Sequence, residues 1–349
     1  MDLIQQLPKA FSLSFEKYVL PFKQASGTSR GVLTEKKGWI FHLKDLESGI
    51  IGKGECSIIP GLSPDYISDE AYEDKLQSVC KQAQFFLENS IKLIDFPSIL
   101  FGLESAYLDW KNGGKGVYFE SPFNQKNAPI PINGLVWMGS ESFMKEQIDA
   151  KLASGFTCIK MKVGAIDFET ELQLLKSIRK RYSAQEIILR VDANGAFTPE
   201  EAMNKLERLA QLDIHSIEQP IKAGNWDAMA KLCQQTPLAI ALDEELIGIN
   251  ETSEKQLLIK TIQPQYIILK PSLHGGFSGS KEWIELANEQ QIPWWITSAL
   301  ESNIGLSAIA QFTGLFDVSI PQGLGTGGLF VSNFESKMHV NNGFLFHHC

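Results

Sequence analysis

Cysteine is scarce in this chain, and its cysteines form none of the usual spaced pairs. Five cysteines occur among 349 residues, and no two of them stand in a CxxC arrangement. An odd number without such pairs argues against a disulfide framework and against a thiolate zinc site. The expectation that follows is a reducing compartment.

Long apolar runs and an excess of positive charge are also lacking. No run reaches the ~18 apolar residues that suggest a membrane span, and the first residues show no basic segment leading into an apolar core, so we expect neither a membrane anchor nor a signal peptide. The formal net charge of −9 disfavours a nucleic-acid-binding surface. We therefore expect a cytoplasmic enzyme acting on a small molecule. The composition leaves homo-oligomerisation open.

The pattern of predicted helices and strands changes after the first third of the sequence. Residues 12–22 and 38–58 indicate strands, and residues 69–95 have the apolar spacing of a helix. The segment Ser121–Pro131 is rich in Pro and Asn and is the predicted linker. We expect a small α+β domain at residues 1–125, joined by the tail at about 322–349, and a second domain at residues 126–321.

In the second domain, short apolar runs alternate with helical stretches. One helix has a clear start, because Thr198 is a predicted N-cap, Pro199 follows it, and Glu201 completes a capping box. Eight parallel strands form either a closed βα barrel or an open doubly wound sheet. The first strand lacks a GxGxxG turn, so the barrel is favoured. The strand candidates are residues 132–139, 158–163, 187–194, 216–220, 238–244, 266–271, 293–299 and a weak last one at Val318–Pro321.

Charged residues fall within or at the ends of these strands. Lys160 and Lys162 share one face of the strand at 158–163, where unpaired charges are costly, so they need carboxylates or a metal nearby. A frayed strand end with solvated lysines is the alternative. Asp192, Glu218 and Asp243 end the next three strands at steps of 26 and 25 residues, which places them together at one end of the barrel.

Three crowded carboxylates raise one another's pKa unless a cation joins them. Oxygen-only ligation favours Mg²⁺, with Mn²⁺ as the alternative, and an ion-pair network with the lysines is the competing interpretation. Lys270 ends the following strand, 27 residues after Asp243, and faces Lys162 across the predicted metal. Lysines flanking a metal can act as bases. The constellation predicts proton abstraction next to a carboxylate, with the metal stabilising the enediolate.

This set of motifs resembles the enolase superfamily, in its muconate lactonizing enzyme subgroup. The motifs are KxK (Lys160, Lys162), D-x-N (Asp192, Asn194), E-x-P (Glu218, Pro220), D-E (Asp243, Glu244) and Lys270. Lys or His bases with Mg²⁺ are the general description of that superfamily's sites. The resemblance implies a modified (β/α)8 TIM barrel and makes the first third of the chain the superfamily's α+β capping domain.

Several stretches further resemble the o-succinylbenzoate synthase family, the dehydratases of menaquinone biosynthesis. They are residues 52–63, 131–139, 297–311 and 322–330. The resemblance implies the substrate 2-succinyl-6-hydroxy-2,4-cyclohexadiene-1-carboxylate, with Lys162 removing the proton and then protonating the departing hydroxide. It implies that Lys270 stays cationic and supports the enediolate and the ring from the other face. Lys160 would lower the pKa of Lys162 by like-charge proximity.

Two other functions stay open. An N-succinylamino acid racemase or another epimerase on the same scaffold would use both lysines as bases. The racemases of this kind carry an arginine three residues after the sixth-strand lysine, where this chain has Leu273, and dipeptide epimerases carry a DxD where this chain has Asp317-Val318-Ser319. The second alternative is a barrel that binds metal or ligand without turnover, which would usually have lost one of these lysines or carboxylates.

Substrate contacts are predicted outside this set. Asn194 belongs to the D-x-N motif, and Ser298, at the seventh strand's end, either orients the succinyl tail or caps the next helix. Gly325 lies in a Gly-rich loop whose backbone N–H groups can touch the substrate. Arg30 lies where the capping domains of the family carry a lid, and can meet a substrate carboxylate or stand solvated at a hairpin tip.

Overall fold

The computed structural model describes residues 3–28, 31–164 and 166–348. Its N-terminal part is an antiparallel sheet covered by helices, with the strand order β1-β2-β3. The elements are β1 (Phe11–Thr28), β2 (Gly31–Asp45), β3 (Ile51–Ser57), α1 (Asp69–Lys81), α2 (Ala83–Glu88), a 3-10 turn η1 (Ser90–Leu93) and α3 (Pro97–Lys111). We call this part, residues 11–111, the cap. The predicted strands and helix are confirmed in place, although the helical stretch 69–95 is divided into three pieces.

Helix α3 was not anticipated, and it explains how the cap holds together. Its residues from Pro97 to Asp109 are all buried, so it lacks the polar face by which an amphipathic helix is recognised. It packs directly on β3 because both elements carry glycines at their contact. A Cβ on Gly54 would lie 1.9 Å from the carbonyl oxygen of Gly102, which leaves no room for any larger residue.

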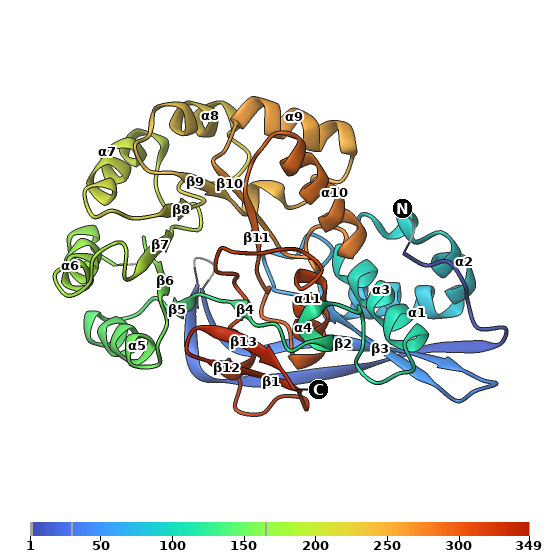
Figure 1. The fold of residues 1–349 in the computed structure, drawn as a ribbon. Helices are drawn as coiled ribbons and strands as arrows, with labels where there is room; N and C mark the ends of the chain where they lie inside the picture. The colour runs from blue at the N-terminus through green and yellow to red at the C-terminus, as the bar shows by residue number, and fades with distance from the viewer. Residues whose placement is uncertain (1–2, 29–30, 165, 349) are drawn as a thin grey trace.

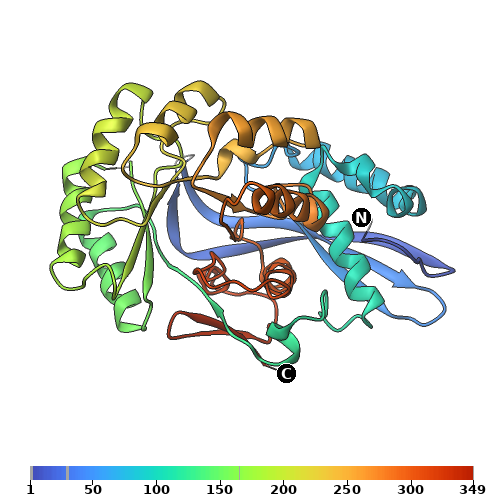
Figure 2. The same cartoon turned by 45° about the horizontal axis from the view of Figure 1, so that its top comes forward.

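The second part is a curled parallel sheet of seven strands, surrounded by helices (Figures 1 and 2). The strands, in spatial order, are β5 (Gly134–Val136), β6 (Cys158–Lys162), β7 (Ile188–Asp192), β8 (Ser216–Glu218), β9 (Ile240–Leu242), β10 (Tyr266–Leu269) and β11 (Trp294–Ile296). The helices are α5 (Glu141–Ala153), α6 (Phe168–Arg179), α7 (Pro199–Ala210), α8 (Trp226–Gln235), α9 (Thr252–Ile262), α10 (Gly276–Glu289) and α11 (Asn303–Thr313), with a 3-10 turn η2 (Glu244–Leu246) after β9. The expected barrel and cap are confirmed.

The start of α7 follows the sequence prediction closely. The Thr198 side chain accepts a hydrogen bond from the Glu201 N–H, and the Glu201 side chain accepts one from the Thr198 N–H. This capping box satisfies two backbone donors at the helix start, and Pro199 occupies the first helical position.

The predicted eighth strand at Val318–Pro321 is wrong. The sheet is instead joined across its gap by isolated parallel bridges, Gln322 with Ile132 and Gly323 with Thr297. The Gln322 side chain substitutes for part of the missing ladder, since its Oε1 accepts a hydrogen bond from the Ile296 N–H at 2.8 Å. Pro321, which has no N–H to donate, stands where the strand would have continued.

Five smaller elements complete the described chain. A short helix α4 (Pro122–Gln125) lies in the predicted linker, and the tail contains a 3-10 turn η3 (Gly327–Leu329). The last hairpin, β12 (Met338–Asn341) and β13 (Phe344–His347), pairs with β4 (Ile130–Pro131). The tail also touches the cap, because Phe22 and Phe330 form an antiparallel bridge. The division of the chain into domains at residue 125 stays a prediction.

Candidate active site

The charged residues predicted from the strands lie at one level of the sheet. Lys162 on β6 is paired with Asp192 on β7, and Asp192 is paired with Glu218 on β8. Asp243 follows the last residue of β9, and Lys270 follows the last residue of β10. Because the strands are parallel, their carboxyl ends meet at one rim, and the five side chains stand there in order.

Asp192 is the centre of the charge network. Its Oδ2 accepts a hydrogen bond from the Nζ of Lys162 at 2.6 Å and forms an ion pair with the Nζ of Lys160 at 3.0 Å. Both lysines therefore lie on the same face of β6, as the alternation of the strand predicts. Lys160 also contacts Glu218 at 2.5 Å. Although burial opposes the charge, the Asp192 and Glu218 carboxylates raise the pKa of Lys160 above its ordinary value.

Glu218 and Asp243 are buried with part of their bonding capacity unused. The Nζ of Lys270 donates to Asp243 Oδ2, whereas Asp243 Oδ1 and Glu218 Oε1 have no hydrogen-bond partner in the described part of the chain. Burial and then the neighbouring Asp192 carboxylate raise the pKa of Glu218 to about 8. A further positive charge beside these two oxygens would relieve that crowding.

The carboxylate oxygens of this site are the ligand type that a hard divalent cation prefers. In this structure, however, the side chains form ion pairs with one another. Among residues 3–28, 31–164 and 166–348, no three His, Cys, Asp or Glu side chains are gathered in a ligating arrangement. The two orphaned carboxylate oxygens and an oxygen-only donor set suit Mg²⁺. The ion-pair interpretation therefore describes the lysines in this structure, and the metal site stays a prediction.

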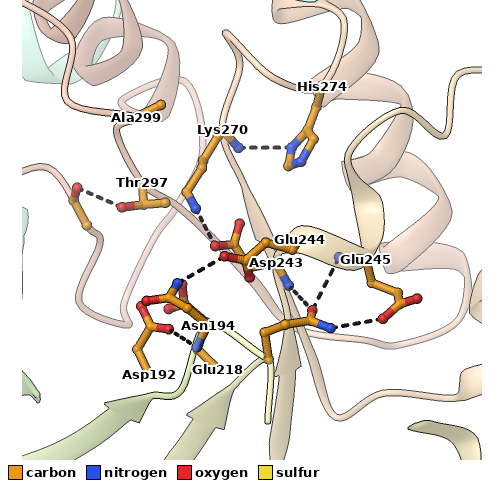
Figure 3. A network of polar contacts seen from close by, with 12 residues as sticks. Asp192, Asn194, Glu218, Asp243, Glu244, Glu245, Lys270, His274, Thr297 and Ala299 are labelled. Carbon is orange, nitrogen blue, oxygen red and sulfur yellow. Dashed lines mark hydrogen bonds and ion pairs between the residues drawn. The ribbon is translucent and has the colours of Figure 1, made fainter. Parts of the chain in front are cut away.

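Asn194 connects the lysine of β6 to the loop after β9. Its Oδ1 accepts a hydrogen bond from Lys162 Nζ at 2.6 Å. Its Nδ2 donates to Glu244 Oε1 at 3.0 Å (Figure 3). Its backbone N–H donates to Asp192 Oδ1 at 3.0 Å. The φ of Asn194 is 44°, a left-handed conformation that Asn tolerates better than most residues.

A supporting residue that the sequence analysis missed is Gln219. Its Oε1 accepts hydrogen bonds from the N–H groups of Asp243 and Glu245, and its Nε2 donates to Glu245 Oε2 at 2.9 Å. The side chain therefore fixes the turn that carries Asp243. Its position directly after Glu218 was the only signal in the sequence, and a lone Gln is too common to be informative.

His274, four residues after Lys270, supports that lysine. Its Nδ1 accepts a hydrogen bond from the Lys270 N–H at 3.0 Å (Figure 3). Burial, with a smaller effect from Lys270, lowers the pKa of His274 to about 3, so the ring is neutral and can accept that bond. Burial also opposes the charge on Lys270, but Asp243 raises the pKa of that lysine above its ordinary value.

A pocket opens over this rim, between the sheet and the cap. Its floor includes Lys160, Lys162, Asn194, Glu218, Glu244 and Lys270. Its walls are largely apolar, with Leu135, Trp137 and Leu300 from the barrel and Leu33, Ile59 and Leu62 from the cap. A charged floor under apolar walls suits a small molecule with a carboxylate at one end.

The remaining predicted contacts lie partly in this pocket. Ser298 and Gly325 both line it, and the Ser298 hydroxyl hydrogen-bonds the Thr326 hydroxyl at 2.6 Å. Ser298 does not cap α11, because Ser302 does so. Arg30 lies outside the described residues.

No helix in the described chain has the length and apolarity that a membrane crossing requires.

The chain is similar in sequence to proteins that are already known. A family model described as enolase C-terminal domain-like matches residues 144–345. The o-succinylbenzoate synthase of Desulfotalea psychrophila is 47% identical over 363 residues, covering 95% of this chain and 98% of that protein.

Solved structures show the same similarity. MenC from Desulfotalea psychrophila LSv54 has a TM-score of 0.84 at 44% identity, covering 96% of this chain and 99% of that chain. The dipeptide epimerase from Enterococcus faecalis V583, complexed with Mg and the dipeptide L-Leu-L-Tyr, has a TM-score of 0.81 at 18% identity, covering 97% and 96%. At that identity the likeness shows the fold alone.

Proposed function

Since the chain belongs to the o-succinylbenzoate synthase family of the enolase superfamily, whose members are lyases that act as dehydratases, we propose how its own residues perform that dehydration. The substrate is 2-succinyl-6-hydroxy-2,4-cyclohexadiene-1-carboxylate and the product is o-succinylbenzoate. The reaction belongs to menaquinone biosynthesis and takes place in the cytoplasm.

The observation that carries the proposal is that Lys162 and Lys270 line one pocket from strands four positions apart in the sheet, with three strands between them. The carboxylates Asp192, Glu218 and Asp243 come from the positions between them. A flat ring bound over the carboxylates therefore meets a lysine at each of its faces. The apolar walls accommodate the ring and the methylene groups of the succinyl chain.

Lys162 carries the proton in this mechanism. As a neutral amine it takes the proton from the carbon next to the ring carboxylate, and the electron pair left behind spreads into that carboxylate. The resulting ammonium then gives the proton to the departing hydroxyl group, so the C–O bond breaks and water leaves from the same face. Lys160 lies beside Lys162, and both lysines pair with Oδ2 of Asp192.

Lys270 is the electrostatic partner. Its ammonium group stays charged on the opposite face, where it stabilises the negative charge that spreads over the carboxylate and ring. Asp192, Glu218 and Asp243 would hold Mg²⁺, which supplies positive charge to the substrate carboxylate when bound. Asn194 keeps Lys162 directed toward the pocket through its hydrogen bond.

An epimerase of N-acylated amino acids would use the same two lysines as bases. Leu273, which is buried where such racemases carry an arginine, gives no support to that alternative. The relevant experiment offers the wild-type chain the cyclohexadiene substrate and N-succinyl amino acids side by side. We expect dehydration to dominate, and a higher rate of racemisation would overturn the proposal.

Lys162→Ala tests the chemistry directly. We expect loss of dehydration by at least about a hundredfold, because the general acid and base is removed. Lys180→Ala, which changes an exposed lysine after α6, is the matched control and should keep wild-type turnover. A barrel that only binds ligand would show no turnover in the wild type and unchanged ligand affinity in Lys162→Ala.

A further inference from the structure

A second cluster of buried ionisable side chains joins the cap to the barrel and is not used by the chemistry above. It consists of Tyr18 on β1, Lys36 on β2, Glu55 on β3 and Glu301 after β11, all of them buried. Each strand of the cap sheet contributes one member, and the barrel contributes the fourth. Buried charges are costly unless they are paired and hydrogen-bonded, so the contacts of this cluster matter to the fold around it.

Lys36 is the member that reaches from the cap to the pocket wall. Its exposed fraction is 3%, and its Nζ donates to the carbonyl oxygens of Ile58 at 2.5 Å and Ala299 at 3.2 Å. Ala299 lines the pocket, and Ile58 precedes the pocket residue Ile59. One ammonium group therefore joins a cap loop and a barrel loop that both face the substrate.

The barrel loop that Lys36 holds, Ser298–Glu301, has a strained backbone. Leu300, which lines the pocket, has a φ of 62°, a conformation that is unfavourable for a bulky side chain. The loop is fixed from within, because the Ala299 N–H donates to Glu301 Oε2 at 2.7 Å and the Leu300 N–H donates to the Ser298 hydroxyl at 3.2 Å. Strain persists only where surrounding contacts enforce it.

The other members anchor the two ends of this loop. Glu301 Oε1 accepts a hydrogen bond from the Ser272 hydroxyl, two residues after Lys270, at 2.5 Å. Glu55 accepts bonds from the N–H groups of Ser302 and Gly305 at the start of α11, at 2.9 and 2.8 Å, and from the Tyr18 hydroxyl. The cap thus forms hydrogen bonds with the start of α11 as well as with the loop before it. Figure 3 shows Ala299 and Thr297 on the segment next to Lys270.

We propose that Lys36 is a positioning residue through which the cap sets the Ser298–Glu301 loop, and with it the affinity for the substrate. The inference rests on the proposed function for the identity of that substrate, an acidic ring compound with a succinyl chain. Lys36 does not line the pocket itself and takes no part in proton transfer. Its removal therefore weakens binding and leaves the chemical step largely intact.

The charge on Lys36 gives the proposal a pH signature. Burial lowers the pKa of Lys36 to about 8, and the Glu301 and Glu55 carboxylates act in the opposite direction. Tyr18, the fourth member of the cluster, donates its hydroxyl hydrogen bond to Glu55. A lysine that loses its proton above pH 8 makes weaker hydrogen bonds to carbonyl groups. The contribution of Lys36 to binding is therefore largest below pH 8.

The test compares Lys36→Met with Lys44→Met, an exposed lysine of the same strand. For Lys36→Met we expect KM to rise about tenfold, the loss of one charged hydrogen bond, with kcat within about twofold of wild type. The ratio of its KM to that of wild type should shrink as the pH passes from 7 to 9. Lys44→Met should match wild type throughout.

Amide hydrogen exchange of residues 296–302 provides the readout that needs no substrate. We expect faster exchange in Lys36→Met and unchanged exchange in Lys44→Met. Unchanged exchange, or faster exchange with an unchanged KM, overturns the inference. If Lys36→Met does not fold, Lys36→Gln, which keeps a donor on a shorter chain, takes its place. If the wild type does not dehydrate the substrate, the proposed function fails, and exchange alone decides the role of Lys36.

Discussion

Lys162 donates a hydrogen bond from Nζ to Oδ1 of Asn194 across 2.6 Å, and the asparagine holds its place in a left-handed backbone conformation. The other end of the same amide donates to Glu244, so its orientation is fixed from both sides. The rate at which a side chain transfers a proton depends on the orientation of that side chain as much as on its pKa. Asn194 is therefore placed to control how Lys162 meets the substrate.

Asn194→Gly should lower kcat by about tenfold to a hundredfold, because misdirecting a catalytic group by a small distance has effects of that size. Glycine adopts the positive φ of this position without strain, so the variant removes the side chain and spares the backbone. Steady-state kinetics and the melting temperature are the measurements. Asn127→Gly, at an exposed residue with a φ of 51°, is the control. An unchanged kcat in Asn194→Gly would show that Lys162 is directed by other groups.

Removal of divalent cations should abolish dehydration, and added Mg²⁺ or Mn²⁺ should restore it. Glu218→Gln should also weaken Mg²⁺ binding, measured by calorimetry without substrate, by about tenfold or more, because a neutral amide attracts a cation less than a carboxylate does. Glu200→Gln, on the exposed surface of α7, should bind Mg²⁺ like wild type. Turnover that is indifferent to a chelator would contradict the metal assignment and leave the ion-pair network as the whole site.

The sequence was most informative where chemistry coincides with strand ends. Asp192, Glu218 and Asp243 were recognisable because each ends a short apolar run, and parallel strands bring such ends together. Lys160 and Lys162 were recognisable because alternation places both on one face. These expectations needed only local pattern and the regular length of a βα unit.

Other parts of the fold and of the site could not be predicted, because they depend on packing between segments far apart in the sequence. Lys36 and Glu55 precede Ala299 and Ser302 by more than 240 residues, so nothing local indicates that they meet. Gln322 joins the sheet through its side chain, which no strand pattern reveals. Helix α3 is buried on every side, so its sequence lacks the alternation of polar and apolar faces on which helix recognition relies.

Lys270→Arg should retain a part of the dehydration activity, whereas Lys270→Met should lose nearly all of it. Arginine preserves the positive charge that the mechanism requires on this face, although its planar head fits the Asp243 contact less well. Single-turnover kinetics of both variants would separate the chemical step from product release. Complete inactivity of the arginine variant, with circular dichroism showing an intact fold, would mean that Lys270 exchanges a proton. The epimerase alternative would then gain support.

Asp65 gives the cap a pH-dependent stability that is separate from catalysis. Its Oδ2 accepts hydrogen bonds from the N–H and the hydroxyl of Ser98 at 3.0 and 2.6 Å, at the start of α3. Burial raises the pKa of Asp65 from its ordinary 3.8 to about 6, and those hydrogen bonds oppose the rise only in part. The folded protein therefore binds more protons at this site than the unfolded chain does between pH 4 and 6.

It follows that the Asp65 contribution to the free energy of unfolding falls as the pH rises through that interval, by about 3 kcal/mol in total. Asp65→Asn removes the titrating group but keeps an oxygen that can accept from Ser98. Relative to wild type, the variant should gain stability between pH 4 and 7, measured by urea unfolding at several pH values. Asp74→Asn, at an exposed position of α1, should show no such gain. A constant difference between Asp65→Asn and wild type across this range would mean that Asp65 has the same pKa in the folded and unfolded protein, and that burial in the cap does not control its ionisation.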